Sequence, residues 1–474
     1  MLKMNRKKAD IDYFVLALFA VSFFSRIFYL GSLPGLHGDE AYFGLNTIKI
    51  LSGDLILNGM NSYTGPLFDY LRVPIFIFSK SVFALRFLSV LFNSLGPVWL
   101  YLILIKFNKK RSSFIVSLLF SFMPWFFLSS RIAWEVMFFP SLILFCIYLF
   151  TCKRYWISLS GLICAFGLWT HAIFASATVP IFILGLALSK SKKSIDFVKS
   201  ASYFALGFAI GLVPKILQMT RFESTVKINS WDQTITFFKA SLNFLPQVLG
   251  GDILYLRQVG DIKTPFSTPL LILLGVAVLL SLLALLRRPK NILIPLVILV
   301  MFILSTLTVS SAVSWITFRY LLIPLSFLSL FFAIILAQSL DLYPKYSVVA
   351  GAIILVSIFS IFTNFFLSEK NTTIKKFSYG TIEDTNAHFV DSFTLYKCLT
   401  NSKIKTKIIA KPLIARSLEF YDATKGKIDI LEIDNISSTP SGVMYIGYAD
   451  EVIPQGFNKT TLDCNLNNFI VLQH

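Results

Sequence analysis

The sequence predicts a polytopic α-helical membrane protein that carries a small α/β domain at its C-terminal end. Of its 474 residues, 55% are hydrophobic and 14% are charged, and the mean hydropathy is +0.72. Soluble domains rarely combine so many apolar residues with so few charges. Long apolar runs recur along residues 1–367, whereas residues 368–474 have an ordinary soluble composition. We therefore expect a transmembrane domain followed by a separate soluble domain.

Apolar runs of about the length needed to cross a membrane define the predicted helices. These eleven runs lie at 12–30, 82–106, 112–129, 136–151, 156–171, 172–189, 200–219, 266–287, 290–309, 315–338 and 345–367. Basic residues at 3–8 precede the first run, which favours a cytoplasmic N-terminus. A cleaved signal peptide is the alternative for residues 1–30, but Phe24, Ser25 and Arg26 offer no small-x-small cleavage site.

The charges of the loops agree with this topology. Lysine and arginine clusters at 106–111, 153–154, 190–199 and 287–290 fall in loops that return to the cytoplasm, and the loop around Lys345 is poor in charge. Four of the five cytoplasmic loops thus follow the positive-inside rule. This pattern predicts a multi-pass protein of the plasma (cytoplasmic) membrane with an extracytoplasmic C-terminal domain. The net charge of +18 is then mainly a topology signal, and no clustered basic face indicates nucleic-acid binding.

Three external parts remain. In the first loop, 31–81, the stretches 40–51 and 66–78 have amphipathic spacing and predict helices that lie in the membrane interface. The segment 220–265 reads as a second external loop. In the tail we expect strands at 403–410, 442–448 and 469–472 and a helix at 412–421.

Cysteine and histidine spacing bears on cross-links and metals. Cys398 and Cys464 both fall in the external domain, where a disulfide would persist, and we predict that they pair. The chain has no Cys-x-x-Cys motif, and its four histidines are widely scattered: His37, His171, His388 and His474. The sequence therefore predicts no metal site.

Two adjacent carboxylates, Asp39 and Glu40, follow the first span directly. Neighbouring residues point in different directions on a helix or a strand, so the two need not share a task. A carboxylate that water reaches at the membrane boundary can take a proton from a hydroxyl, as a general base does. The alternative is that Gly38-Asp39 is a helix N-cap that opens a helix at 40–51. The two readings are compatible.

Arginines gather on the same side of the membrane. Four of them lie at or near the outer ends of predicted spans: Arg26, Arg86, Arg131 and Arg319. The acids on this side include Asp39, Glu40 and Glu135. An arginine within a span costs about 2.5–3.5 kcal/mol, so this concentration predicts a polar cavity. Guanidinium groups there would bind a phosphate well. Snorkelling to lipid headgroups and pairing with the acids is the alternative.

Three motifs add to this pattern. Residues 63–71 read Tyr-Thr-Gly-Pro-Leu-Phe-Asp-Tyr-Leu, 130–135 read Ser-Arg-Ile-Ala-Trp-Glu, and 319–324 read Arg-Tyr-Leu-Leu-Ile-Pro. With the external Asp-Glu pair and the early arginine of the second span, they resemble the GT-C glycosyltransferases over about residues 10–340. The closest branch is the protein O-mannosyltransferase and aminoarabinose transferase group. That group often has Lys-Pro where this chain has Thr64-Gly65, so its lysine contact to the donor phosphate has no counterpart there.

The resemblance implies an inverting glycosyltransferase that moves a hexosyl or pentosyl group from a polyprenyl-phosphate donor to an extracytoplasmic protein, lipid or glycan. It implies Asp39 as the base that deprotonates the acceptor hydroxyl, with Glu40 beside it, and Glu135 and Asp69 as the next candidates. The implied substrate-binding residues are Tyr63, Asp69, Arg86, Arg131, Glu135, His171, Arg319 and Tyr320. A phosphate leaving group needs no strong general acid, so we expect no required cofactor or metal.

A transporter or flippase of lipid-linked saccharides is the alternative function. It too would need cationic sites on the outer side, and it should also carry charge deeper in the bilayer. Lys215, about half-way along the run 200–219 or beyond, is the residue that favours this alternative. A purely structural membrane protein would leave the outer arginines unexplained.

Overall fold

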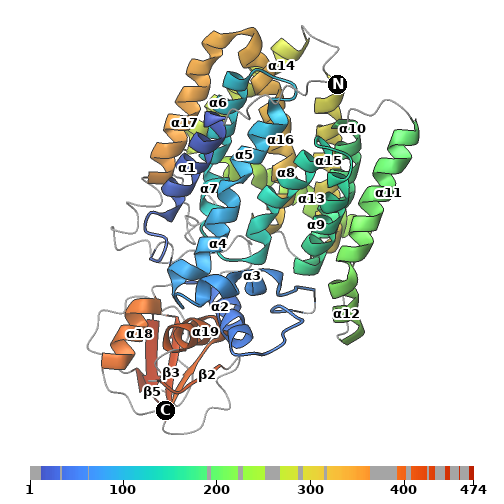
Figure 1. The fold of residues 1–474 in the computed structure, drawn as a ribbon. Helices are drawn as coiled ribbons and strands as arrows, with labels where there is room; N and C mark the ends of the chain where they lie inside the picture. Colours follow the sequence, from blue (N-terminus) through green and yellow to red (C-terminus); the bar gives the residue numbers. More distant parts are fainter. Residues whose placement is uncertain are drawn as a thin grey trace, which may run out of the picture.

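The computed structural model consists of a helical bundle and a small mixed sheet at one end of it (Figure 1). It describes residues 12–32, 35–61, 63–188, 194–221, 228–250, 267–286, 292–313, 318–362, 392–401, 407–423, 426, 428–432, 443–448, 458–459 and 469–473. The predicted domain boundary at 367 falls between the last bundle helix and residue 392, outside these ranges.

Each predicted apolar run coincides with one helix or with a broken pair of helices. The single helices are α1 (Tyr13–Ile27), α8 (Phe139–Phe150), α9 (Trp156–Thr170), α10 (Ala175–Leu188), α14 (Ser267–Leu286), α15 (Leu293–Ala312), α16 (Phe318–Leu342) and α17 (Ser347–Ile361). The pairs are α4 (Val82–Ser94) with α5 (Gly96–Leu104), α6 (Lys110–Ser121) with α7 (Pro124–Ser129), and α11 (Ser194–Gly211) with α12 (Val213–Arg221). Pro97 and Pro124 lie in the first turns of α5 and α7, where a missing N–H costs little.

The predicted total of eleven spans is not confirmed. Among the described residues, four helices are long and apolar enough to cross a membrane: Val82–Leu104, Leu293–Ala312, Phe318–Leu342 and Pro344–Ile361. The pair α11 and α12, bent by 40°, makes a fifth if it is counted as one span. The other apolar helices, among them α1, α8 and α9, are shorter than this criterion requires.

One long helix lies where the sequence predicted a loop. Helix α13 (Trp231–Gly250) occupies much of 220–265 and packs against α7, α14 and α15. Asn229 fixes its start, because its side-chain amide donates hydrogen bonds to the carbonyls of Ser310 and Val313. Exposed polar residues such as Lys239 separate its apolar residues along the sequence, so it contains no continuous apolar run. The expectation of a loop was therefore wrong over this helix.

The two amphipathic stretches form helices α2 (Gly38–Leu51) and α3 (Leu67–Phe76), next to the C-terminal domain (Figure 1). His37, and not Gly38-Asp39, caps α2: its Nδ1 accepts a hydrogen bond from the backbone N–H of Asp39 at 3.0 Å. Glu40 completes a capping box by accepting from the N–H of His37 at 3.3 Å. The helix thus begins two residues earlier than predicted, at Gly38 instead of residue 40, which leaves the side chain of Asp39 available for other contacts.

The C-terminal domain has the predicted α/β character. Its described elements are α18 (Ser392–Asn401), β1 (Ile408–Ala410), α19 (Pro412–Asp422), β2 (Ile430–Glu432), β3 (Met444–Tyr448), β4 (Asn458–Lys459) and β5 (Phe469–Gln473). The strand order is β2-β1-β3-β5-β4, with β1 parallel to β2 and β3 and with β5 antiparallel to β3 and β4. Cys398 is disulfide-bonded, and its predicted partner Cys464 lies outside the described residues.

Candidate active site

A polar pocket lies at the end of the bundle that faces the C-terminal domain, with about 330 Å³ of empty space including its mouth. Its walls are formed by Asp39, Phe43, Met60, Asn61, Tyr63, Trp134, Glu135, His171, Arg319 and Tyr320. Six of the ten predicted site residues therefore meet at one place: Asp39, Tyr63, Glu135, His171, Arg319 and Tyr320. They come from α2, the loop before α3, the turn before α8, the junction of α9 and α10, and the start of α16.

Asp39 is the carboxylate at the pocket mouth. Its side chain is 18% exposed, and its Oδ2 lies 3.7 Å from Nη1 of Arg319. Because Nδ1 of His37 accepts the hydrogen bond that caps α2, this nitrogen carries no proton. Asp39 therefore has the guanidinium of Arg319 as its neighbour and remains partly exposed to solvent. A general base needs such exposure to reach the hydroxyl group that it deprotonates.

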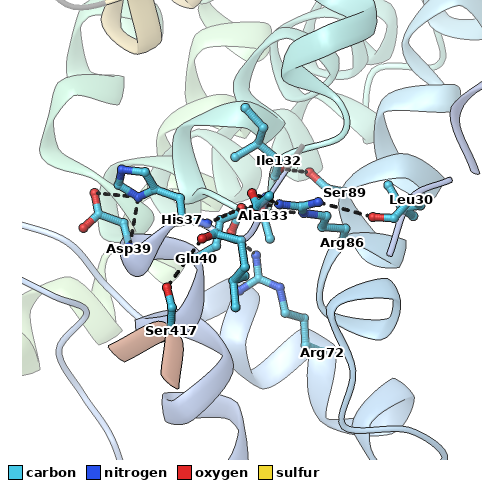
Figure 2. A network of polar contacts seen from close by, with 12 residues as sticks. Leu30, His37, Asp39, Glu40, Arg72, Arg86, Ser89, Ile132, Ala133 and Ser417 are labelled. Carbon is cyan, nitrogen blue, oxygen red and sulfur yellow. Dashed lines mark hydrogen bonds and ion pairs between the residues drawn. The ribbon is translucent and has the colours of Figure 1, made fainter. Parts of the chain in front are cut away.

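Glu40, the next residue, points away from the pocket (Figure 2). It is fully buried, and Nε and Nη2 of Arg86 donate to its two oxygens at 2.9 and 2.6 Å. Its Oε1 also accepts from the backbone N–H of Ala133 at 2.8 Å. The predicted catalytic role of Glu40 and the predicted substrate contact of Arg86 do not fit these buried positions, whereas the alternative of an acid paired with an outer arginine does.

A second buried ion pair supports the same wall. Nη1 of Arg72 lies 2.8 Å from Oδ1 of Asp69, and its Nη2 donates to the carbonyl of Ala133 at 2.6 Å. Burial raises the pKa of Asp69 to about 7, although the charge of Arg72 acts against this shift. Asp69 is 1% exposed, so the predicted substrate contact does not fit its position either.

Arg131 is the fourth predicted site residue that does not line the pocket. It is fully buried and donates a hydrogen bond from Nη1 to the carbonyl of Arg26. Ser89 adds a hydrogen bond from its Oγ to the carbonyl of Ile132 at 2.7 Å (Figure 2). With the contacts to Ala133, these bonds fix the backbone of 131–133 from behind. The next two residues, Trp134 and Glu135, face the pocket. The buried arginines therefore position the wall instead of binding a ligand.

Backbone pairing brings Tyr63 beside His171. Thr64 and His171 form an antiparallel bridge, flanked by bonds from the N–H of Gly65 to Thr170 and from the N–H of Ala172 to Tyr63, both of 2.9 Å. The rings of Tyr63 and His171 have centroids 5.2 Å apart. A Cβ atom at position 65 would lie 2.4 Å from the carbonyl oxygen of Trp169, which explains the glycine.

The hydrogens of these two side chains can be assigned. Nδ1 of His171 accepts from the N–H of Ile173 at 3.1 Å, so its ring hydrogen belongs to Nε2. Burial raises the pKa of Tyr63 to about 12, which keeps its hydroxyl protonated. The hydroxyl oxygen accepts from Nδ2 of Asn61 at 3.0 Å. Both residues thus present a hydrogen-bond donor to an anion.

Lys215 lies behind the Thr64 bridge. Its Nζ donates to Oε1 of Gln218 at 2.9 Å, and Nε2 of Gln218 donates to the carbonyl of Thr64 at 2.6 Å. The residue that favoured a transporter is therefore at the pocket end of the bundle, where it supports the loop that carries Tyr63.

Arg319 opens α16 and completes the pocket. Its guanidinium carbon lies 5.8 Å from the ring centre of Trp134 and 5.1 Å from that of Tyr320. Its side chain is 23% exposed, so it combines a fixed orientation with access to a ligand. Among the residues that the structure describes, no group of three His, Cys, Asp or Glu side chains could hold a metal ion.

Sequence reasoning missed Phe43, Met60, Asn61 and Trp134 of the pocket wall, and Arg416 of the C-terminal domain. Trp134 stands within the motif 130–135, next to the predicted Glu135, so its position was a usable signal. Arg416, from the C-terminal domain, has its Nη1 3.9 Å from Oδ1 of Asp39. No pattern in the sequence pointed to it, because it belongs to a separate domain.

No protein-family model and no curated protein matches this chain. Among solved structures, it is similar to ArnT from Cupriavidus metallidurans in the apo state, with 10% identity, a TM-score of 0.43, and coverage of 96% of this chain and 97% of the other. A second ArnT structure from that organism, bound to undecaprenyl phosphate, has 10% identity, a TM-score of 0.38, and 97% coverage of both chains.

Proposed function

We propose that this chain is a glycosyltransferase that moves a sugar from a polyprenyl-phosphate donor to a hydroxyl group of an extracytoplasmic acceptor, with inversion at the anomeric carbon. The observation that carries the proposal is the juxtaposition of Asp39 with Arg319 in a pocket lined by aromatic rings. A carboxylate base, a cation for phosphate and aromatic faces for a sugar are the groups that this transfer needs.

The reaction assigns one task to each group. Asp39 accepts the proton of the acceptor hydroxyl as its oxygen attacks the anomeric carbon from the face opposite the phosphate. The new glycosidic bond forms as the bond between that carbon and the phosphate oxygen breaks, and the electron pair leaves with the polyprenyl phosphate. Arg319 stabilises the charge that develops on this oxygen. Tyr63 and the Nε2–H of His171 supply further hydrogen bonds to it.

The remaining pocket residues orient the sugar. The rings of Trp134 and Tyr320 offer apolar faces to the C–H groups of a pyranose, and Glu135 and Asn61 are hydrogen-bond partners for its hydroxyls. The buried ion pairs of Glu40 and Asp69 hold this wall without touching the substrate. No step requires a metal ion, so turnover should persist when a chelator is added.

The orientation in the membrane is part of the proposal and rests on the loop charges. Reporter fusions after Lys110 should report a cytoplasmic location, and fusions after Lys370 an extracytoplasmic one. A cytoplasmic C-terminal domain would place the pocket on the wrong side for an extracytoplasmic acceptor and would overturn this part.

The decisive experiment measures turnover by the purified full chain. It is supplied with short-chain polyprenyl-phosphate sugars and a mixture of extracytoplasmic glycans and lipids, and released polyprenyl phosphate is quantified by mass spectrometry. We expect release together with a glycosylated acceptor. In sealed vesicles, movement of intact donor across the bilayer without cleavage would instead indicate a transporter or flippase.

A further inference from the structure

The C-terminal domain packs directly on α2. Phe420 of α19 is 3% exposed and lies over Gly44, where a Cβ atom would come within 2.4 Å of the phenylalanine ring. Ser417, one turn earlier, donates a hydrogen bond from its Oγ to the carbonyl of Leu36, 3.4 Å away. Figure 2 shows Ser417 close to the first turn of α2. Shape and one hydrogen bond therefore define where α19 sits.

Arg416 lies on the same helix, four residues before Phe420, and so points to the same side. Its guanidinium carbon is 5.5 Å from the ring centre of Tyr42 on α2. Its Nη1 lies 3.9 Å from Sδ of Met60 and 3.9 Å from Oδ1 of Asp39. Because Met60 and Asp39 both line the pocket, the C-terminal domain reaches the rim of the site with a positive charge.

Glu432 on β2 holds this guanidinium from the other side. Nε of Arg416 donates to Oε2 at 3.0 Å, and its Nη2 donates to Oε1 at 2.7 Å. Two parallel bonds of this kind fix the plane of a guanidinium group. The third nitrogen, Nη1, donates a hydrogen bond to Sδ of Met60 and lies 3.9 Å from Oδ1 of Asp39, and the arginine side chain is only 20% exposed.

We infer that Arg416 is a positioning residue for Asp39, and that the C-terminal domain thereby completes the active site; this rests on the proposed function. Arg319 of the bundle faces Oδ2 of Asp39 at 3.7 Å, and Arg416 faces Oδ1 at 3.9 Å. Guanidinium groups from two domains thus flank the two oxygens. Without Arg416 the carboxylate loses one of these partners and rotates away from the acceptor hydroxyl. A displacement of a reacting group by about 1 Å typically costs on the order of 10²-fold in rate.

The test compares steady-state kinetics of the purified full chain carrying Arg416→Gln, Arg416→Lys or Lys397→Gln. We expect Arg416→Gln to lower kcat by about 10- to 100-fold, with KM for donor and acceptor within about twofold of the wild type. Arg416→Lys should recover part of kcat, because it keeps the charge. Lys397 is the matched control: it lies over Phe393 on α18, so Lys397→Gln removes a charge from the same domain and should leave both parameters unchanged.

Two kinetic results would overturn the inference. An unchanged kcat in Arg416→Gln would leave Arg416 as an interdomain ion pair. A raised KM with unchanged kcat would mean that it binds substrate and does not position Asp39.

A measurement without turnover separates this inference from the proposed function. Midpoints of thermal unfolding are compared for Asp39→Asn, Arg416→Gln and the double variant, and we expect non-additivity of about 1 °C or more. Additive shifts would show that the two side chains do not interact and would overturn the inference. If the wild-type chain shows no turnover, both the proposed function and the positioning role of Arg416 in it are wrong. The non-additivity of the unfolding midpoints still shows whether Asp39 and Arg416 interact.

Discussion

The pocket and the layer of ion pairs directly behind it use the same residue types for opposite purposes. In the pocket, Asp39 and Arg319 are 3.7 Å apart, and each keeps about a fifth of its side chain exposed. Behind it, Glu40 and Arg86 are 2.6 Å apart and fully buried. The charged groups of a short, buried ion pair are already fully bonded to each other and cannot contact a ligand. The groups of a longer, partly exposed pair can. Access to water therefore distinguishes Asp39, the proposed base, from Glu40, which lies in a sealed ion pair, although the two are neighbours in the chain.

The largest loss of activity should follow from changing Asp39, the partly exposed acid of the pocket. Asp39→Asn removes the base, and we expect kcat to fall by about 10²–10⁴-fold. The midpoint of thermal unfolding should change by only a few degrees, because His37 and not Asp39 caps α2 and the ion pairs of Asp39 are long and partly exposed. Near-normal turnover would contradict the assignment and move the base to Glu135, the other carboxylate that lines the pocket.

The second largest loss of activity should follow from changing Arg319, the partly exposed arginine of the pocket. Arg319→Ala should lower kcat/KM by on the order of 10²-fold, with contributions from a higher donor KM and a lower kcat, because a phosphate contact acts in ground and transition states. Arg319→Lys serves as the control that retains charge and should lose less. If only the acceptor KM responds to Arg319→Ala, the phosphate must bind elsewhere in the pocket.

Changing the buried pair of Glu40 and Arg86 should instead lower stability more than activity. Glu40→Gln leaves the Arg86 charge buried without its counter-charge, a change that typically costs about 3–5 kcal/mol of stability. Turnover per folded molecule should remain within roughly one order of magnitude of the wild type, since Glu40 does not line the pocket. Chemical unfolding and kinetics on the same preparation check this. A large loss of kcat at unchanged stability would mean that Glu40 takes part in the chemistry.

The last effect concerns the dependence of stability on pH. The pKa of Asp69 is raised to about 7 in the folded chain, above the value of about 4 expected for the unfolded chain. Between these values the folded state binds a proton that the unfolded state does not, so this residue makes stability fall as pH rises from about 4 to about 7. Asp69→Asn should flatten the dependence of the unfolding midpoint on pH over this range. An identical slope in both proteins would exclude Asp69 as its source.

Much of the fold could be predicted because apolar runs and turn positions are local signals. The predicted runs became helices, and β1, α19, β3 and β5 lie where the tail pattern placed them. Helix α13 was not predicted because polar residues divide its apolar residues, so the sequence contains no continuous apolar run there. The N-cap of α2 was predicted at the wrong residue because a histidine side chain takes the role that usually belongs to Asp, Asn, Ser or Thr.

Six of the residues that line the pocket were predicted from residue type and place in the sequence, but the directions of their side chains were not. Sequence alone could not decide whether Asp39 or Glu40 faces the cavity, because this depends on how α2 is rotated against its neighbours. Arg86 and Arg131 met the same criteria as Arg319, and only packing shows that they are sealed. Arg416 could not be found at all, since its relation to Asp39 arises from contact between two domains.

The missing side chain of Gly44 has a consequence for how this protein tolerates change. A methyl group there would overlap the ring of Phe420 and push α19 outward. Arg416 is carried on that helix, so the displacement would be transmitted to the carboxylate of Asp39. Replacement of Gly44 by alanine would then lower the rate of the proposed reaction, although residue 44 does not contact substrate. Selection on activity, as well as on folding, would therefore limit which residues can occupy this position.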